Sequence, residues 1–109
     1  MAYDKELAAR VRRAFSKVPN VVEKPMFGGL TFMVDGNLCC GVLKDELMIR
    51  LDRDTDLATL DSPNIRVCDL TSRPMRGLFV VDAPGCSTQR GVNRWIRRAI
   101  DHALSLPAK

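Results

Sequence analysis

The stretch that decides the fold is KPMFGGLTFMVDGN, residues 24–37 of the 109-residue chain. Leu30, Phe32 and Val34 alternate with Thr31 and Met33, which is typical of a strand with one apolar face. The paired glycines before this strand permit backbone angles or close approaches that a Cβ atom would forbid. The Asp-Gly-Asn at 35–37 predicts a hairpin turn, because Asp-Gly tolerates the positive φ angles of a type I′ turn.

Further strands are predicted on both sides of this stretch. Residues 21–27 precede it, and Pro25 places that strand at a sheet edge or a bulge because proline cannot donate a ladder hydrogen bond. After the turn, residues 38–42 and 46–51 each carry apolar side chains at every second position, which predicts a meander. Shorter strand patterns occupy residues 65–68 and 75–81.

The two adjacent cysteines lie in the return strand of the predicted hairpin. Strict alternation along residues 38–42 points Cys40 inward and Cys39 outward. The four cysteines of the chain contain no Cys-x-x-Cys pair, so we expect free thiols in a reducing compartment. A disulfide or a metal role is the alternative.

Two amphipathic helices are predicted near the ends of the chain, over residues 4–17 and 88–106, with apolar side chains at three- and four-residue spacing. Asp4 is the expected N-cap of the first helix. A short helix with acids in its first turn is predicted over residues 52–60. The pattern predicts an α+β fold in one domain spanning residues 1–109. In it an antiparallel sheet of about five strands, with a central meander, is packed by the N- and C-terminal helices.

Composition limits the class of protein. The chain is 46% hydrophobic and 28% charged, an ordinary globular balance. No apolar run approaches the about 20 residues that cross a bilayer, and the first residues lack the layout of a secretory signal. We therefore expect a cytoplasmic protein without membrane contact. The net charge of +4 is concentrated at the two ends, while the middle of the chain is acidic.

The basic face of the second long helix is the best binding candidate. Its members are Arg90, Arg94, Arg97 and Arg98. Arg90, Arg94 and Arg98 are one turn apart, so their guanidinium groups can follow a phosphate backbone. Trp95, near the edge of this stripe, either adds a stacking surface or anchors the core. A solvated helix face that contains Asp101 is the alternative interpretation.

Other patterns give weaker support for chemistry. The DxDxD run at 52–56 resembles the start of a calcium loop, but leucine and proline stand where such a loop needs glycine and glutamate. The glycine pair lacks the spacing of a phosphate-binding loop. His102 has no nucleophile or acid beside it in a triad pattern. We therefore predict no catalytic residue, no cofactor and no metal site.

The RPMRG segment at 73–77 leaves a second hypothesis open. A proline there can fix the backbone so that a guanidinium recognises a carboxylate or phosphate, although a structural ion pair explains it equally. The alternative function is a small-ligand-binding protein or an enzyme with a pocket near Gly28-Gly29 and the Arg73 loop. A third hypothesis is a homodimer that pairs through a sheet edge or an apolar patch.

In their order and spacing these motifs resemble the N-terminal domain of the TfoX/Sxy family. The resemblance is carried by KPMFGG at 24–29, DGN at 35–37, LMIR at 47–50, RPMRG at 73–77 and the final helix with its tryptophan. The motif positions, which we interpret as structural core and turn positions, are Met26, Phe27, Gly28, Gly29, Gly36, Arg73, Pro74, Met75 and Gly77.

The resemblance implies an α+β domain without catalytic residues and a non-enzymatic, regulatory role. Two-domain members of the family regulate natural competence, acting with the cyclic-AMP receptor protein on promoters of DNA-uptake genes. The sequence ends where their second, all-helical domain would begin. By resemblance we expect a protein partner in the transcription machinery, with nucleic acid as a further partner of the arginine face.

Overall fold

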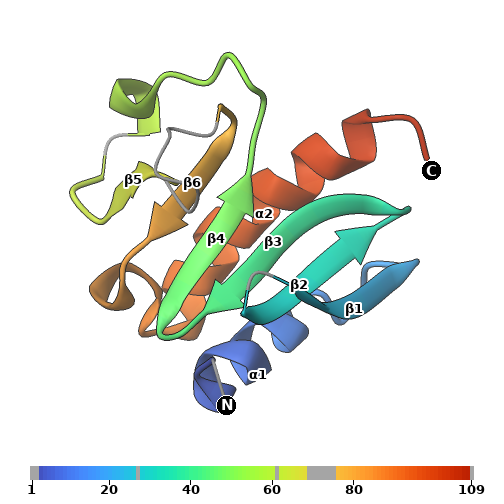
Figure 1. Cartoon of the computed structure of the whole chain (residues 1–109), viewed down its shortest axis with the longest axis horizontal. Helices are drawn as coiled ribbons and strands as arrows, with labels where there is room; N and C mark the ends of the chain where they lie inside the picture. Colours follow the sequence, from blue (N-terminus) through green and yellow to red (C-terminus); the bar gives the residue numbers. More distant parts are fainter. Residues whose placement is uncertain (1–2, 27, 61, 69–75, 109) are drawn as a thin grey trace.

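The computed structural model describes residues 3–26, 28–60, 62–68 and 76–108. They form an α+β fold in which a six-stranded antiparallel sheet carries two helices on one of its faces (Figure 1). The order of strands across the sheet is β1-β2-β3-β4-β6-β5. The strands are β1 (Val21–Met26), β2 (Gly29–Val34), β3 (Asn37–Leu43), β4 (Glu46–Arg50), β5 (Ile65–Val67) and β6 (Leu78–Val81).

The predicted meander is confirmed, because β2, β3 and β4 are consecutive neighbours in the sheet. Asp35 and Gly36 turn the chain between β2 and β3 with φ angles of 52° and 81°, the positive values that a type I′ turn needs. Lys44 has a φ of 57° between β3 and β4. The sheet has one strand more than the expected five, since the short β5 pairs with β6 at the far edge.

Both terminal helices are present. Helix α1 (Lys5–Ala14) begins as predicted, with Asp4 Oδ1 accepting from the backbone N–H of Glu6 at 2.7 Å and of Leu7 at 3.1 Å. It ends before residue 17, and residues 15–17 form a turn. Helix α2 (Gln89–Ser105) agrees with its prediction to within its capping residues. Among the described residues no helix is long and apolar enough to span a bilayer.

The helix predicted over residues 52–60 is wrong for most of its length. Only the 3-10 helix η1 (Leu57–Leu60) forms there. Asp52 Oδ1 accepts from the backbone N–H of Asp54 at 2.8 Å, and Asp56 Oδ1 accepts from that of Ala58 at 3.0 Å. Such local bonds give the backbone an alternative to the α-helix, so these acids shape turns. A second 3-10 helix, η2 (Ala83–Cys86), joins β6 to α2.

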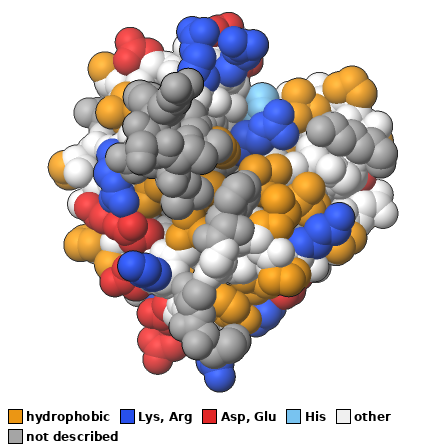
Figure 2. Space-filling view, in the orientation of Figure 1, with side chains coloured by type: hydrophobic (Ala, Val, Ile, Leu, Met, Phe, Trp, Pro, Cys, Tyr) orange, Lys and Arg blue, Asp and Glu red, His pale blue; other side chains and the backbone are white. Residues whose placement is uncertain are grey.

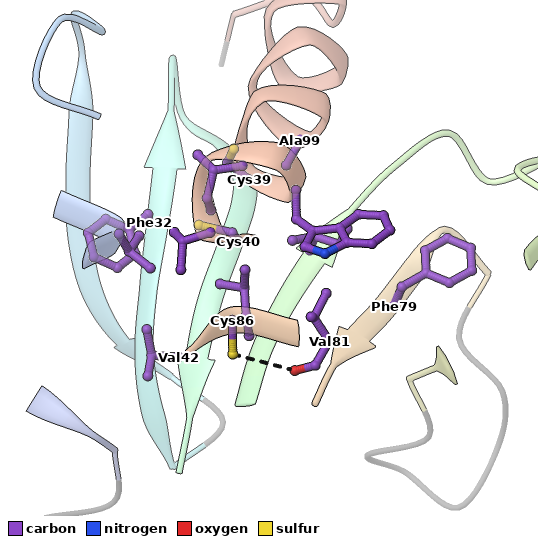
Figure 3. Close-up of a cluster of buried hydrophobic side chains, with 14 of the residues drawn as sticks. Phe32, Cys39, Cys40, Val42, Phe79, Val81, Cys86 and Ala99 are labelled. Carbon is purple, nitrogen blue, oxygen red and sulfur yellow. Dashed lines mark hydrogen bonds between the residues drawn. The ribbon is translucent and has the colours of Figure 1, made fainter. Parts of the chain in front are cut away.

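The main core lies between the sheet and the two helices. In α2, Trp95 is 1% exposed, and the rings of Phe15 and Phe32 stack with centroids 5.4 Å apart. Figure 3 shows part of this cluster, with sheet side chains such as Phe32 and Val42 on one side and Ala99 of α2 on the other. Each large apolar side chain buried here contributes about 1.5–3 kcal/mol to stability.

The outward orientation predicted for Cys39 is wrong. Phe32 pairs with Cys40 while Met33 pairs with Leu38, so Cys39 is an extra residue on β3. A β-bulge of this kind interrupts the strict alternation of side chains along a strand. Both thiols are consequently buried in the same core cluster (Figure 3).

The edge position predicted for residues 21–27 is confirmed, because β1 is the first strand of the sheet and has only β2 as a neighbour. Glu23 of this strand is held by Arg12 of α1, whose Nε and Nη2 donate to the two carboxylate oxygens at 2.9 and 2.8 Å. The hydrogen bonds from Arg12 lower the pKa of Glu23. Pro25 and this ion pair protect the edge from further strand pairing.

Neither α1 nor α2 lies over the opposite face of the sheet. Met48, Cys68 and Val80 are buried there, and half-buried leucines lie around them. Figure 2, which has the orientation of Figure 1, looks onto this face and shows hydrophobic side chains gathered on it. The structure therefore has a large core under the helices and a smaller apolar cluster on the other side.

The two neighbouring glycines should differ in their response to substitution. An added Cβ at Gly29 would lie 2.1 Å from the carbonyl oxygen of Val42, so the pairing of β2 with β3 would have to shift. At Gly28 the added Cβ meets nothing within 4 Å, and only the φ of +74° is unfavourable. We expect Gly28→Ala to cost about 1–2 kcal/mol and Gly29→Ala to cost about 3 kcal/mol or more. Urea unfolding of both variants checks this, and equal losses would contradict it.

Candidate functional site

The four predicted arginines lie together on the outer face of α2. Arg90, Arg94, Arg97 and Arg98 are all exposed. At about 1.5 Å of rise per residue, Arg90 and Arg98 are about 12 Å apart along the helix axis. The structure therefore places these side chains in one stripe, as the sequence predicted.

The local sequence explains why the arginines face outward. Thr88 Oγ1 accepts from the backbone N–H of Gly91 at 3.0 Å and starts the helix. Gly91 has no room for a Cβ, because the carbonyl oxygen of Gly85 would lie 2.7 Å away. The first turn of α2 is thus pressed against η2, and the apolar side of the helix faces the sheet. The buried members of that side are Val92, Trp95, Ile96, Ala99 and Ala103.

The charges of the stripe are not neutralised within the described part of the chain. None of the four arginines forms an ion pair with a carboxylate of residues 3–26, 28–60, 62–68 or 76–108. This holds although Asp101 is exposed on the same helix. Two arginines of α1 differ, since Arg10 pairs with Glu6 at 3.9 Å and Arg12 pairs with Glu23 at 2.8 Å. The α2 stripe is therefore positively charged and faces solvent.

Trp95 does not offer the stacking surface that was one of its two predicted roles. Its side chain is 1% exposed, so it anchors the core. The guanidinium carbon of Arg94 lies 4.6 Å from the centroid of its ring, within the range of a cation–π contact. Trp95 therefore helps to position Arg94.

Two polar residues that the sequence analysis did not single out complete this surface. Gln89 and Asn93 line the same open depression of about 710 Å³ as the four arginines. Gln89 Nε2 donates to the carbonyl oxygen of Arg10 at 2.7 Å and to Asn93 Oδ1 at 2.9 Å, which ties α2 to α1. Gln89 Oε1 is buried without a hydrogen-bond partner among the described residues. Each of the two residues lies four positions before another member of the surface, so a helical wheel would have placed both on the arginine face.

The family motif positions differ in how the structure bears on them. Gly28, Gly36 and Gly77 all have a positive φ and serve turns, as interpreted from the sequence. A Cβ at Gly29 has no room against β3. Met26 is 39% exposed at the end of β1, so its interpretation as a core position is wrong. Phe27, Arg73, Pro74 and Met75 lie outside the described residues.

A small cavity near the RPMRG segment bears on the alternative hypothesis. It has a volume of about 280 Å³ and includes Arg53, Thr55, Arg76 and Phe79 in its lining. Arg76 Nη2 lies 3.8 Å from Asp54 Oδ1 in an exposed ion pair. The lining therefore contains two arginines, the carboxylate of Asp54 and apolar side chains. Arg73 itself falls outside the described residues.

The thiols are buried in apolar surroundings, as Cys39, Cys40, Cys68 and Cys86 are each at most 2% exposed. Burial raises the pKa of the Cys40 thiol well above its usual value and that of Cys86 to about 11. The neutral thiol is a poor nucleophile and a poor metal ligand. In the part of the chain that the structure describes, no three His, Cys, Asp or Glu side chains are grouped to hold a metal ion.

The fold and this surface define a small α+β domain with a basic face on its C-terminal helix. The chain matches the family described as TfoX N-terminal domain over residues 13–103, and it belongs to that family. Comparison with curated proteins and with solved structures finds no match.

The raised pKa of Cys86 predicts a loss of stability in alkaline solution. Between pH 9 and about 11 the unfolded chain gives up this thiol proton while the folded chain keeps it. Unfolding then releases a proton, so the free energy of unfolding falls as the pH rises through this interval. Urea unfolding of the wild type and of Cys86→Ala from pH 8 to 11 measures the difference. An equally steep decline in both proteins would contradict this role of Cys86.

Proposed function

We propose that the chain is a non-enzymatic binding domain of transcriptional regulation, which docks to a protein partner and contacts nucleic acid with the arginine face of α2. The observation that supports the proposal most is the exposure of Arg90, Arg94, Arg97 and Arg98 without a carboxylate partner among the described residues. The chain belongs to the TfoX N-terminal domain family. The resemblance supports the regulatory role, because two-domain proteins with this N-terminal domain act at promoters.

The geometry of the stripe suits a phosphate backbone. Duplex DNA carries one negative charge per about 1.7 Å of its axis, so a row of guanidinium groups about 12 Å long meets several phosphates. Each contact releases condensed counterions, which makes binding sensitive to salt. The side chains are arginines, which can bind a phosphate with two parallel hydrogen bonds.

The burial of most described aromatic side chains favours one mode of contact with nucleic acid over another. Of the aromatic residues that the structure describes, Phe15, Phe32, Phe79 and Trp95 are each at most 5% exposed, and Tyr3 is half-buried. Binding of single strands usually needs aromatic faces on which bases stack. We therefore favour contact with the phosphates of a duplex, which positions the domain without reading the base sequence.

The cavity near Arg76 supports a second candidate function, the binding of a small anionic ligand. Its two guanidinium groups suit a carboxylate or a phosphate. Its volume of about 280 Å³ lies just below the about 300–1,000 Å³ that is usual for ligand sites. The binding domain is therefore the preferred proposal.

Replacing Arg94 and Arg98 with glutamate should weaken binding to a duplex of random sequence and reduce its dependence on salt. Each phosphate contact contributes about 0.9 to the slope of log K against log salt, so we expect the slope to fall by about 2. Fluorescence anisotropy at several salt concentrations measures both quantities.

The matched control is Lys5→Glu with Lys24→Glu, which changes the net charge equally at exposed positions away from α2. We expect the control to keep most of the dependence of duplex binding on salt concentration. An Arg94/Arg98 variant whose affinity and slope equal those of the control would remove the arginine face from the proposal.

A further inference from the structure

We propose that the seam between α1 and α2 is the docking site for an acidic, amphipathic segment of a partner protein. The inference names the chemistry of the protein partner and rests on the proposed function in that respect. The seam contains a cleft of about 210 Å³ to which both helices contribute. Ala14, Ile96 and Ile100 supply its apolar side chains, and Arg13 and Arg97 supply its positive charges.

The apolar part of the cleft is incompletely covered. Ile96 is 1% exposed, whereas Ala14 and Ile100 pack against the core and stay half-buried. A volume of about 210 Å³ is below the about 300–1,000 Å³ of usual small-molecule sites. The space therefore suits an apolar side chain of a partner that anchors itself between the helices, as in helix-in-groove recognition.

The charges of the seam indicate which residues flank that anchor. Arg13 and Arg97 are exposed, and neither pairs with a carboxylate of the described residues. On α1 this distinguishes Arg13 from Arg10 and Arg12, which pair with Glu6 and Glu23. Two unneutralised guanidinium groups beside the apolar side chains of Ala14 and Ile100 complement carboxylates beside an apolar anchor.

The composition of the seam favours a protein over nucleic acid as its occupant. Ala14 and Ile100 give phosphates no favourable contact, whereas Asp101, which also lines the cleft, repels phosphates and carboxylates alike. A partner segment can offer an apolar side chain to Ala14 and Ile100 and place its carboxylates beside the two arginines, which a phosphate backbone cannot do. Arg90, Arg94 and Arg98 line the neighbouring depression and not this cleft, while Arg97 and Asn93 line both. The two surfaces are therefore adjacent but separable by substitution.

The test uses two synthetic peptides of identical composition, made of glutamate and leucine. In the first, the leucines recur at three- and four-residue spacing and form one helical face. In the second they are scattered around the helix. Fluorescence anisotropy with the full chain should show at least about tenfold tighter binding of the first peptide, because only that peptide presents an anchor with flanking carboxylates.

Substitutions inside and outside the cleft test whether the first peptide binds there. Ala14→Glu places a negative charge in the cleft and should weaken binding of the first peptide about tenfold. Ile100→Ala removes part of the apolar lining without adding charge and should weaken it severalfold. Leu104→Glu adds the same charge as Ala14→Glu at a position of α2 that is 51% exposed and outside the cleft lining, and it should have little effect. Circular dichroism confirms that each variant is folded.

Equal binding of the two peptides, or equal losses with Ala14→Glu and Leu104→Glu, would overturn the inference. The inference would also fail if Ile100→Ala weakened binding to duplex DNA as much as the Arg94/Arg98 substitutions do, since the seam would then be part of a nucleic-acid site. A peptide that binds as expected while duplex binding fails leaves the seam intact and counts against the nucleic-acid part of the proposed function only.

Discussion

The burial of Trp95 against the sheet is the interaction on which the rest of the arrangement depends. Trp95 is 1% exposed and belongs to an apolar stripe that runs along α2. A helix turns about 100° per residue, so burying this stripe turns the opposite side of α2 to solvent. The arginine face is therefore a consequence of core packing, and a change that rotated α2 would disperse it.

Packing of both helices on the same face of the sheet creates the second surface. The seam exists because α1 and α2 lie side by side, linked by Gln89, which donates from α2 to the carbonyl oxygen of Arg10. Arg13 and Arg97 are 84 positions apart in the chain, yet both line one cleft. The sequence can predict the side chains that each helix contributes to such a surface, but not that the two helices lie side by side.

The sequence predicted those parts of the fold that depend on local patterns. The meander, the edge position set by Pro25 and the two helices follow from periodicity and turn residues. Residues 52–60 and Cys39 were predicted wrongly, because each depends on a competing local interaction. Aspartate side chains bond the backbone at 52–58, and a bulge opposite Phe32 turns Cys39 into the core.

The candidate site also has one part that local sequence patterns predict and one part that they do not. The four arginines belong to one helix and were predicted residue by residue, whereas the seam needs tertiary structure. Whether Trp95 stacks on a ligand or anchors the core was equally beyond the sequence, since both roles suit a tryptophan at the border of an apolar stripe. Its burial decides the point and directs the nucleic-acid proposal to phosphates.

The burial of Trp95 is tested most directly by quenching of its fluorescence with acrylamide. Acrylamide is neutral and so is not drawn to the arginines. Trp95 is the only tryptophan of the chain, so the signal comes from one side chain. The account predicts blue-shifted emission and little quenching in the folded protein, with strong quenching in urea. Quenching in the folded protein as efficient as in urea would show that α2 does not pack through Trp95, and the proposed surfaces would lose their basis.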